Sequence, residues 1–341
     1  AKGSQRRAVE ALPAFVMCRR EAESEGAARS ALVAARRAAA TGDPGAVLDA
    51  VRSAGTPQAT VTGVRLRGVE GRALREQNRF AKSAQAYEAS ADLALRIGWL
   101  HGAAVALHEI GLGAAKRTKW VVSLEAWDRL ATVYELLDDK PGVASALCNL
   151  GTSHKKLEQH PQALAAYERA LPLARQAGNR AGVAIILNHL GEVSDDLGHH
   201  ARALSLQEES CALFEELEDW TGVADALRGM GHVHTSMGDF ARALTCYERS
   251  LHVREKLGAG DGIASLLASI GWSHRQIGQY GEAVASYERL LALEETSRNR
   301  AGIARALAGL GSVLVDLGAY TKALPLLERA LATREELKDP V

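Results

Sequence analysis

The sequence predicts an all-α fold, an α-solenoid of stacked antiparallel helix pairs, and two columns of glycine carry this prediction. Six glycines of a first column follow one another at intervals of 40 residues: Gly102, Gly142, Gly182, Gly222, Gly262 and Gly302. A second column runs beside it with the same period: Gly111, Gly151, Gly191, Gly231, Gly271 and Gly311. A fixed period of this size is the signature of a repeat array, in which each unit packs only on its neighbours.

Each period contains two helical patterns with a break between them. The stretch VASALCNLGTSHKKLEQHPQALAAYERALPLARQAGN has apolar residues at helical spacing, then a turn, then a second helical run. Glycines suited to the left-handed conformation of a helix C-cap end the first helix of four periods: Gly198, Gly238, Gly278 and Gly318. Because Thr118 and Glu158 take this place in two earlier periods, we expect looser turns there. A bulky or ring residue follows each turn: Phe80, Trp120, His160, His200, Phe240, Tyr280 and Tyr320.

The second helix carries its own recurring aromatic residue, which is typical of a core position. This column consists of Tyr87, Trp127, Tyr167, Tyr247 and Tyr287. Glycine inside a helix costs about 0.5–1 kcal/mol relative to alanine, so a repeated glycine needs a structural reason. We expect that reason to be close approach, with the first helix crossing a neighbouring helix where no side chain fits.

The composition excludes some classes of partner. Lys plus Arg and Asp plus Glu both number 41, so the whole chain has no net charge that would attract nucleic acid or an anionic membrane. No apolar run reaches the length of a membrane span, and the first residues lack the apolar core of a secretory signal. The cysteines show no CxxC spacing, which favours free thiols in a reducing, cytoplasmic compartment: Cys18, Cys148, Cys211 and Cys246.

The order of residues within one period resembles the tetratricopeptide repeat. In the third period this order is Leu150, Gly151, His154, Ala163, Tyr167 and Ala170. The 40-residue period exceeds the usual ~34 residues and is similar to the long-helix variant of kinesin light chains and of bacterial regulatory arrays such as those joined to CHAT proteases. The resemblance covers residues 63–341 as about seven repeats and implies a right-handed superhelix. Residues 1–62 are expected to form an N-terminal helical cap or a degenerate repeat.

The resemblance also implies a function, because the first helix of each repeat lines a concave groove that binds a protein or a peptide. The groove-facing positions chosen as partner-binding residues are Asn149, Asn188, Arg228, His232, Trp272, Arg275 and Arg305. Trp272 is the most distinctive of them, because no core column demands an aromatic side chain there. A second interpretation applies to charged groove positions: Lys155 and Asp195, like Lys156 and Asp196, occupy equivalent places in adjacent repeats and could form ion pairs with each other instead of binding a partner.

Motifs for catalysis are absent from the sequence. There is no HExxH, no GxSxG and no phosphate-binding loop, so we expect no catalytic residue, no metal site and no cofactor. Two weaker alternatives remain. Glu192 and Asp196 are spaced by four residues and could hold a cation, and Cys148 could act as a nucleophile beside His108 or His189.

The biological setting is expected to be a larger bacterial signalling or defence protein. The chain starts with Ala1 and stops just after Asp339-Pro340, and the last repeat would leave Leu324, Leu327 and Leu331 bare, which favours a C-terminal effector domain of the same polypeptide. The alternative is a peptide-pheromone-type receptor that regulates transcription. That alternative needs a helix-turn-helix, and residues 5–55 are too rich in alanine and too poor in turn residues to favour one.

Overall fold

The computed structural model describes residues 25–55, 60–258, 260 and 262–338, and no strand occurs among them. Cys18 lies outside these residues, and so do residues 1–24 and 56–59 of the expected N-terminal cap. Residues 25–40 are helical and are followed by α2 (Pro44–Arg52). The turn between them is left-handed at Gly42, with φ of 73°, and Asp43 caps α2 through its side chain.

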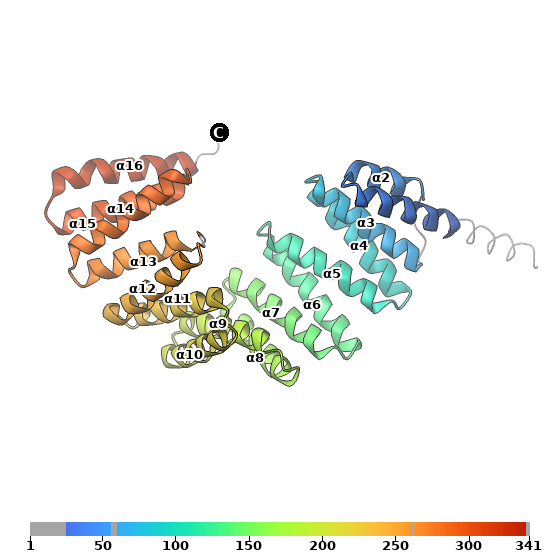
Figure 1. The fold of residues 1–341 in the computed structure, drawn as a ribbon, viewed down its shortest axis with the longest axis horizontal. Helices are drawn as coiled ribbons and strands as arrows, with labels where there is room; N and C mark the ends of the chain where they lie inside the picture. Colours follow the sequence, from blue (N-terminus) through green and yellow to red (C-terminus); the bar gives the residue numbers. More distant parts are fainter. Residues whose placement is uncertain (1–24, 56–59, 259, 261, 339–341) are drawn as a thin grey trace, which may run out of the picture. The chain divides into compact units, whose positions relative to one another are not determined.

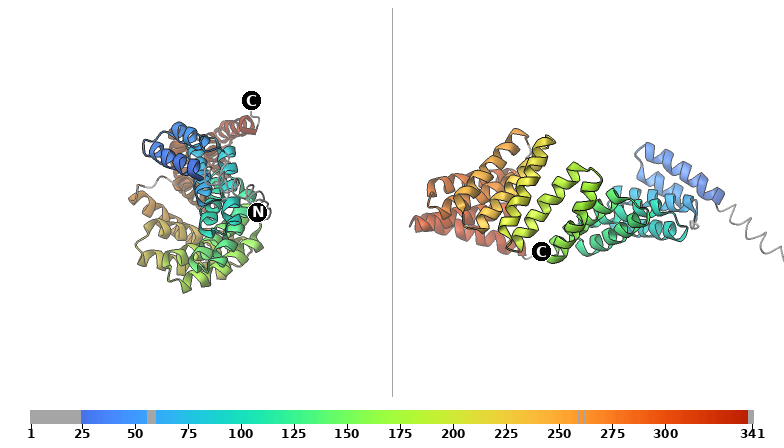
Figure 2. Two further views of the ribbon diagram at one scale, coloured as in Figure 1. Left: turned by 90° about the vertical axis from the view of Figure 1, so that its right-hand side faces the viewer. Right: turned by 90° about the horizontal axis from the view of Figure 1, so that it is seen from below.

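The chain forms two compact units, one that ends at Ala177 and one that begins at Gly178. In the first unit, α2 is followed by α3 (Val61–Glu76), α4 (Phe80–Arg96), α5 (Leu100–Ala115), α6 (Trp120–Leu136), α7 (Lys140–Lys156) and α8 (His160–Gln176). The second unit consists of α9 (Arg180–Asp196), α10 (His200–Glu216), α11 (Trp220–Ser236), α12 (Phe240–Lys256), α13 (Ile263–Gln276), α14 (Tyr280–Thr296), α15 (Arg300–Asp316) and α16 (Tyr320–Lys338). Within each unit successive helices run antiparallel and side by side (Figures 1 and 2). The predicted all-α fold of helix pairs is confirmed.

The turns within the repeats are more uniform than the sequence suggests. Each predicted ring residue is the first residue of its helix, as Phe80 is in α4 and Tyr320 in α16. The expectation of looser turns at Thr118 and Glu158 is wrong, because both residues adopt the same left-handed conformation as Gly198, with φ of 55° and 59° against 80°. The turn after Glu158 is also closed by a backbone hydrogen bond, from Gln159 N to His154 O at 3.0 Å.

The first glycine column lies at the start of each helix, and not inside it as a costly interruption. Gly142, for example, is the third residue of α7, and its N–H donates to the Asp139 side chain, which caps the helix at 3.0 Å. Gly262 differs, because it is itself the left-handed N-cap of a shortened α13. The sequence has Ala259 at the position where four other repeats have a capping side chain: Asp139, Asn179, Asp219 and Asn299.

The second glycine column makes the predicted close approach. A Cβ atom added at Gly111 would lie 2.6 Å from the Trp127 ring, and one added at Gly231 would lie 2.5 Å from the Tyr247 ring. Trp127 and Tyr247 are almost completely buried. The recurring aromatic side chain of the second helix therefore packs flat on the glycine of the first helix, and this contact forms the repeated core of each unit.

The last helix leaves part of the expected apolar surface uncovered. Leu324 and Leu331 are 59% and 58% exposed, whereas Leu327 packs against Gly311 and is half-buried. Among the helices of the described residues, none is both long and apolar enough to cross a bilayer.

Candidate partner-binding site

Four of the seven predicted site residues line one cavity of the second unit. This cavity has a volume of about 390 Å³ and lies between α11, α13 and α15, with contributions from α12 and α14. We call it the Trp272 pocket, and its polar and aromatic lining residues are His232, Thr235, Tyr247, Ser269, Trp272, Arg275, Tyr287, Arg305 and Ser312. Most of them come from the first helix of a repeat, as expected for groove-facing positions.

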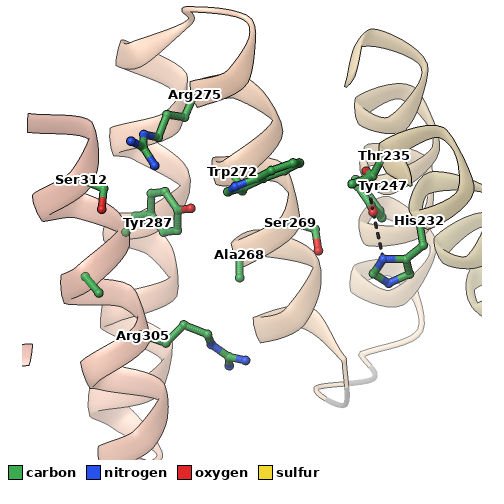
Figure 3. A pocket seen from close by; sticks show the side chains of 12 residues that line it. His232, Thr235, Tyr247, Ala268, Ser269, Trp272, Arg275, Tyr287, Arg305 and Ser312 are labelled. Atoms are coloured by element: carbon green, nitrogen blue, oxygen red, sulfur yellow. Dashed lines mark hydrogen bonds between the residues drawn. The ribbon is translucent and has the colours of Figure 1, made fainter. Parts of the chain in front are cut away.

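Trp272 lies at the centre of this pocket, between the Tyr247 side and the Tyr287 side (Figure 3). Its side chain is 37% exposed, so much of the ring is available to a ligand. The ring is held edge-to-face by Phe240, the first residue of α12, with 5.2 Å between the ring centroids and 82° between the planes. A large apolar ring that is fixed by a neighbour loses little conformational entropy when it binds a partner.

Two arginines flank Trp272 at opposite ends of the pocket (Figure 3). Arg275 pairs with Asp316, with Nη2 3.2 Å from Oδ1, and this contact lowers the pKa of the Asp316 carboxyl. Arg305 donates to the buried Glu294 carboxylate at 3.2 Å, and its own side chain remains 50% exposed. Because no Asp or Glu is among the described residues that line the pocket, its surface offers cationic donors and no anion.

The aromatic column contributes to the site as well as to the core, which the sequence interpretation missed. Tyr247 packs on Gly231, yet its hydroxyl reaches the pocket, 3.1 Å from His232 Nδ1 and 3.1 Å from Thr235 Oγ1. Burial raises the pKa of Tyr247, so the phenol stays neutral and can donate or accept a hydrogen bond. The sequence did not indicate this second role. A tyrosine recurs at this position whenever its ring packs on the glycine, whether or not its hydroxyl also reaches a cavity.

The other three predicted residues do not line the Trp272 pocket. Arg228 lies between two carboxylates, Glu192 at 3.5 Å and Asp225 at 3.4 Å, so its charge is balanced within the second unit. Asn188 is buried in α9. Asn149 belongs to the first unit, where its Nδ2 donates to the Ser145 carbonyl at 3.1 Å. A binding role for these three residues stays a prediction.

The charged residues also bear on the two interpretations of the groove. Arg228 with Glu192, and Arg275 with Asp316, are ion pairs between adjacent repeats of the second unit. Pairing between repeats is therefore real for these side chains. Arg275 and Arg305 still line the pocket with guanidinium donors, whereas their partners Asp316 and Glu294 are not among its lining residues.

The metal and nucleophile alternatives find little geometric support. Glu192 contacts Arg228 and His189, each at 3.5 Å, and in the described part of the chain no three metal-ligating side chains come together. Burial raises the pKa of the Cys148 thiol to about 12. A thiol with that pKa is protonated at neutral pH, whereas the thiolate is the nucleophilic form.

The raised pKa gives a direct prediction for thiol labelling. At pH 8 Cys148 should react with iodoacetamide on the order of a thousandfold more slowly in the native chain than in the urea-unfolded chain, where its pKa is ~8.5. The native rate should keep rising above pH 9, because the folded pKa lies well above the unfolded one. Mass spectrometry of the Cys148 peptide measures both rates. Equal rates in the two states would contradict the burial argument.

Comparison with known proteins identifies the repeat. A tetratricopeptide repeat family model matches residues 102–176, 144–216 and 222–296, and a second tetratricopeptide repeat model matches residues 268–336. A comparison with curated protein sequences finds no match to this chain.

Solved structures share the fold at low sequence identity. The apo quorum sensor NprR from B. thuringiensis is 13% identical, with a TM-score of 0.61 over 89% of this chain and 86% of that one. A Rap protein complexed with competence and sporulation factor is 12% identical, with a TM-score of 0.58 over 92% and 99% of the two chains. A putative kinesin light chain from Podosopora anserina with nearly identical TPR-like repeats is 14% identical, with a TM-score of 0.51 over 59% and 99%.

Proposed function

The chain belongs to the tetratricopeptide repeat family, and from this premise we propose that it acts by binding a protein or peptide segment in the Trp272 pocket. It is a repeat scaffold of the protein- or peptide-binding kind. In this proposal the partner that binds the pocket is an extended or helical segment with an apolar anchor and acidic residues. Binding, and not catalysis, is its role in this proposal.

One observation carries the proposal: a half-exposed tryptophan stands between two arginine side chains in a cavity without a lining carboxylate. Tryptophan and arginine are the residue types most often found as binding hot spots. The anchor of the partner would pack on Trp272, while its carboxylates would meet Arg275 and Arg305. The tyrosine hydroxyl and His232 provide hydrogen bonds at the far wall.

The charge of Arg305 tests the proposal. The probe is a peptide selected from a random library for binding to the full chain. Arg305→Gln keeps a donor for Glu294 but removes the charge, so we expect about five- to tenfold weaker binding, slower association and a smaller salt dependence. Arg300→Gln is the matched control, because Arg300 lies on the same helix, outside the pocket, and pairs with Glu336. Equal losses for both variants would contradict the proposal.

A second candidate function is a receptor for a small signalling peptide. Its support is the likeness of fold to a Rap protein complexed with competence and sporulation factor and to the quorum sensor NprR. This candidate differs in partner size: a signalling peptide of a few residues should saturate the Trp272 pocket by itself. The first candidate includes a role in a larger bacterial signalling or defence protein. It also includes docking of a further domain on the α16 surface, which the exposed Leu324 and Leu331 side chains support.

A further inference from the structure

The first unit contains a second cavity, which the interpretation of the sequence did not predict. It has a volume of about 540 Å³ and lies between the helix of residues 25–40, α3, α4 and α5. We call it the Arg65 pocket, after the residues that define it: Arg36, Val64, Arg65, Arg72, Trp99 and Val105. It is independent of the Trp272 pocket, because all its lining residues belong to the first unit.

The Arg65 pocket has an excess of positive charge. Within the described residues, Arg36, Arg65 and Arg72 form no ion pair with a carboxylate. Glu109 is the one acidic side chain of the lining, and it is already paired with Arg75, which lies outside the lining. Three uncompensated guanidinium groups around one cavity favour a ligand with more than one negative charge.

Part of the remaining wall is apolar, and its largest apolar side chain is held in place by its neighbours. The Arg65 guanidinium lies 5.5 Å from the centroid of the Trp99 ring, and a Cβ added at Gly102 would collide with the same ring. Trp99 is thus fixed between Arg65 and the Gly102 backbone. Val105 also lines the pocket and is 67% exposed, so it is available to a ligand. A ligand here needs an apolar group as well as anionic groups.

The spacing of the arginines indicates the shape of that ligand. Arg65 and Arg72 are seven residues apart on α3, which places them on one face about 10.5 Å apart along the helix axis. An extended peptide in the polyproline II conformation advances about 3.1 Å per residue with three residues per turn, so side chains three residues apart lie on one face, about 9 Å from each other. A single phosphate concentrates its charge at one point and has no apolar part to cover Val64 and Val105.

We propose that the Arg65 pocket binds an extended acidic peptide segment, with two carboxylate side chains three residues apart and an aliphatic side chain between them. The carboxylates pair with Arg65 and Arg72, with Arg36 adding charge from the facing helix. The aliphatic side chain packs against Val64, Val105 and the edge of Trp99. This site gives the chain a second recognition surface, separate from the partner site of the second unit.

Calorimetric titration of the full chain tests this proposal with two capped peptides. The probe is acetyl-Gly-Glu-Val-Ala-Glu-Gly-amide, and the control peptide has glutamine at both glutamate positions. We expect the glutamate peptide to bind at low ionic strength and the glutamine peptide to bind at least about tenfold more weakly. Arg65→Ala with Arg72→Ala should weaken the glutamate peptide about tenfold or more.

Further variants make the result decisive. Arg37→Ala is the matched control, because Arg37 is exposed on the same helix as Arg36 and does not line the cavity. Val105→Glu, at an exposed position, should block the acidic peptide without affecting the core, and Trp220→Ala, outside both pockets, should leave its binding unchanged. No binding of the glutamate peptide, or equal binding of both peptides, would overturn the proposal. Pyrophosphate that binds these arginines more tightly than the peptide would overturn it in favour of a phosphorylated small ligand.

Discussion

Replacing Gly111 with alanine is expected to destabilise the first unit by about 1–3 kcal/mol, whereas the same change at Gly113 is expected to stabilise it by about 0.5–1 kcal/mol. Both glycines lie inside α5, two residues apart. A Cβ at Gly111 would lie 2.6 Å from the Trp127 ring, which is buried and has no room to move away. A Cβ at Gly113 would meet nothing within 4 Å, so alanine there only improves helix propensity.

Urea denaturation of the full chain, followed by circular dichroism, compares the two variants under identical conditions. A double-mutant cycle tests the cause of the destabilisation. Gly111→Ala should lower the free energy of unfolding less in the Trp127→Leu background than in the wild type, because the two sites are in contact. If both alanine variants lower the midpoint equally, packing of the aromatic side chain on glycine does not explain the second glycine column.

Trp272→Ala is expected to weaken binding of a library-selected peptide by about 2 kcal/mol, roughly 30-fold, while the thermal midpoint changes little. The binding loss follows from the position of the ring at the centre of the pocket, between Arg275 and Arg305. The stability effect is small because the side chain is 37% exposed and its edge-to-face contact with Phe240 is worth only about 0.5–1.5 kcal/mol.

Trp220→Ala is the matched control for Trp272. Trp220 is 48% exposed, is also on the first helix of a repeat, and does not line the pocket. It should therefore leave peptide binding unchanged. If Trp272→Ala unfolds the second unit while Trp220→Ala does not, Trp272 is a core residue and the site assignment is wrong.

Much of the fold could be predicted because equivalent residues recur every 40 residues, so each structural position can be recognised from several copies. The ring residues mark the first residue of the second helices, and the glycine of the second column marks the contact with Trp127 or Tyr247. Turn geometry was harder to predict, since Thr118 and Glu158 adopt left-handed conformations that their side chains disfavour. Backbone hydrogen bonds within the turn, such as those from Lys119 N to Ala114 O and from Gln159 N to His154 O, close it in that conformation whatever the side chain.

The site was only partly predictable, for a related reason. Trp272 could be identified because it differs from the residues at the equivalent positions of the other repeats. His232, Arg275 and Arg305 were predicted because they occupy groove-facing positions. The ion pairs of Arg228 and Arg275 depend on which side chains two stacked helices bring together, which the period alone does not fix. The 40-residue period aligns Arg65 with Arg305 and Arg72 with Trp272. The Arg65 pocket was nevertheless missed, because it also needs Arg36 and the helix of residues 25–40, which lie outside the repeat pattern.

Hydrogen–deuterium exchange with a bound peptide tests the central claim, that the Trp272 pocket is the partner site, most directly. The peptide is one selected from a random library that also binds the Arg65→Ala, Arg72→Ala variant, which excludes the first-unit cavity. We expect the bound peptide to slow amide exchange in α13 and α15 of the second unit. In α14 only the turn that contains Tyr287, which lines the pocket, should be affected. Protection confined to α12, α14 and α16, with α13 and α15 unchanged, would contradict it.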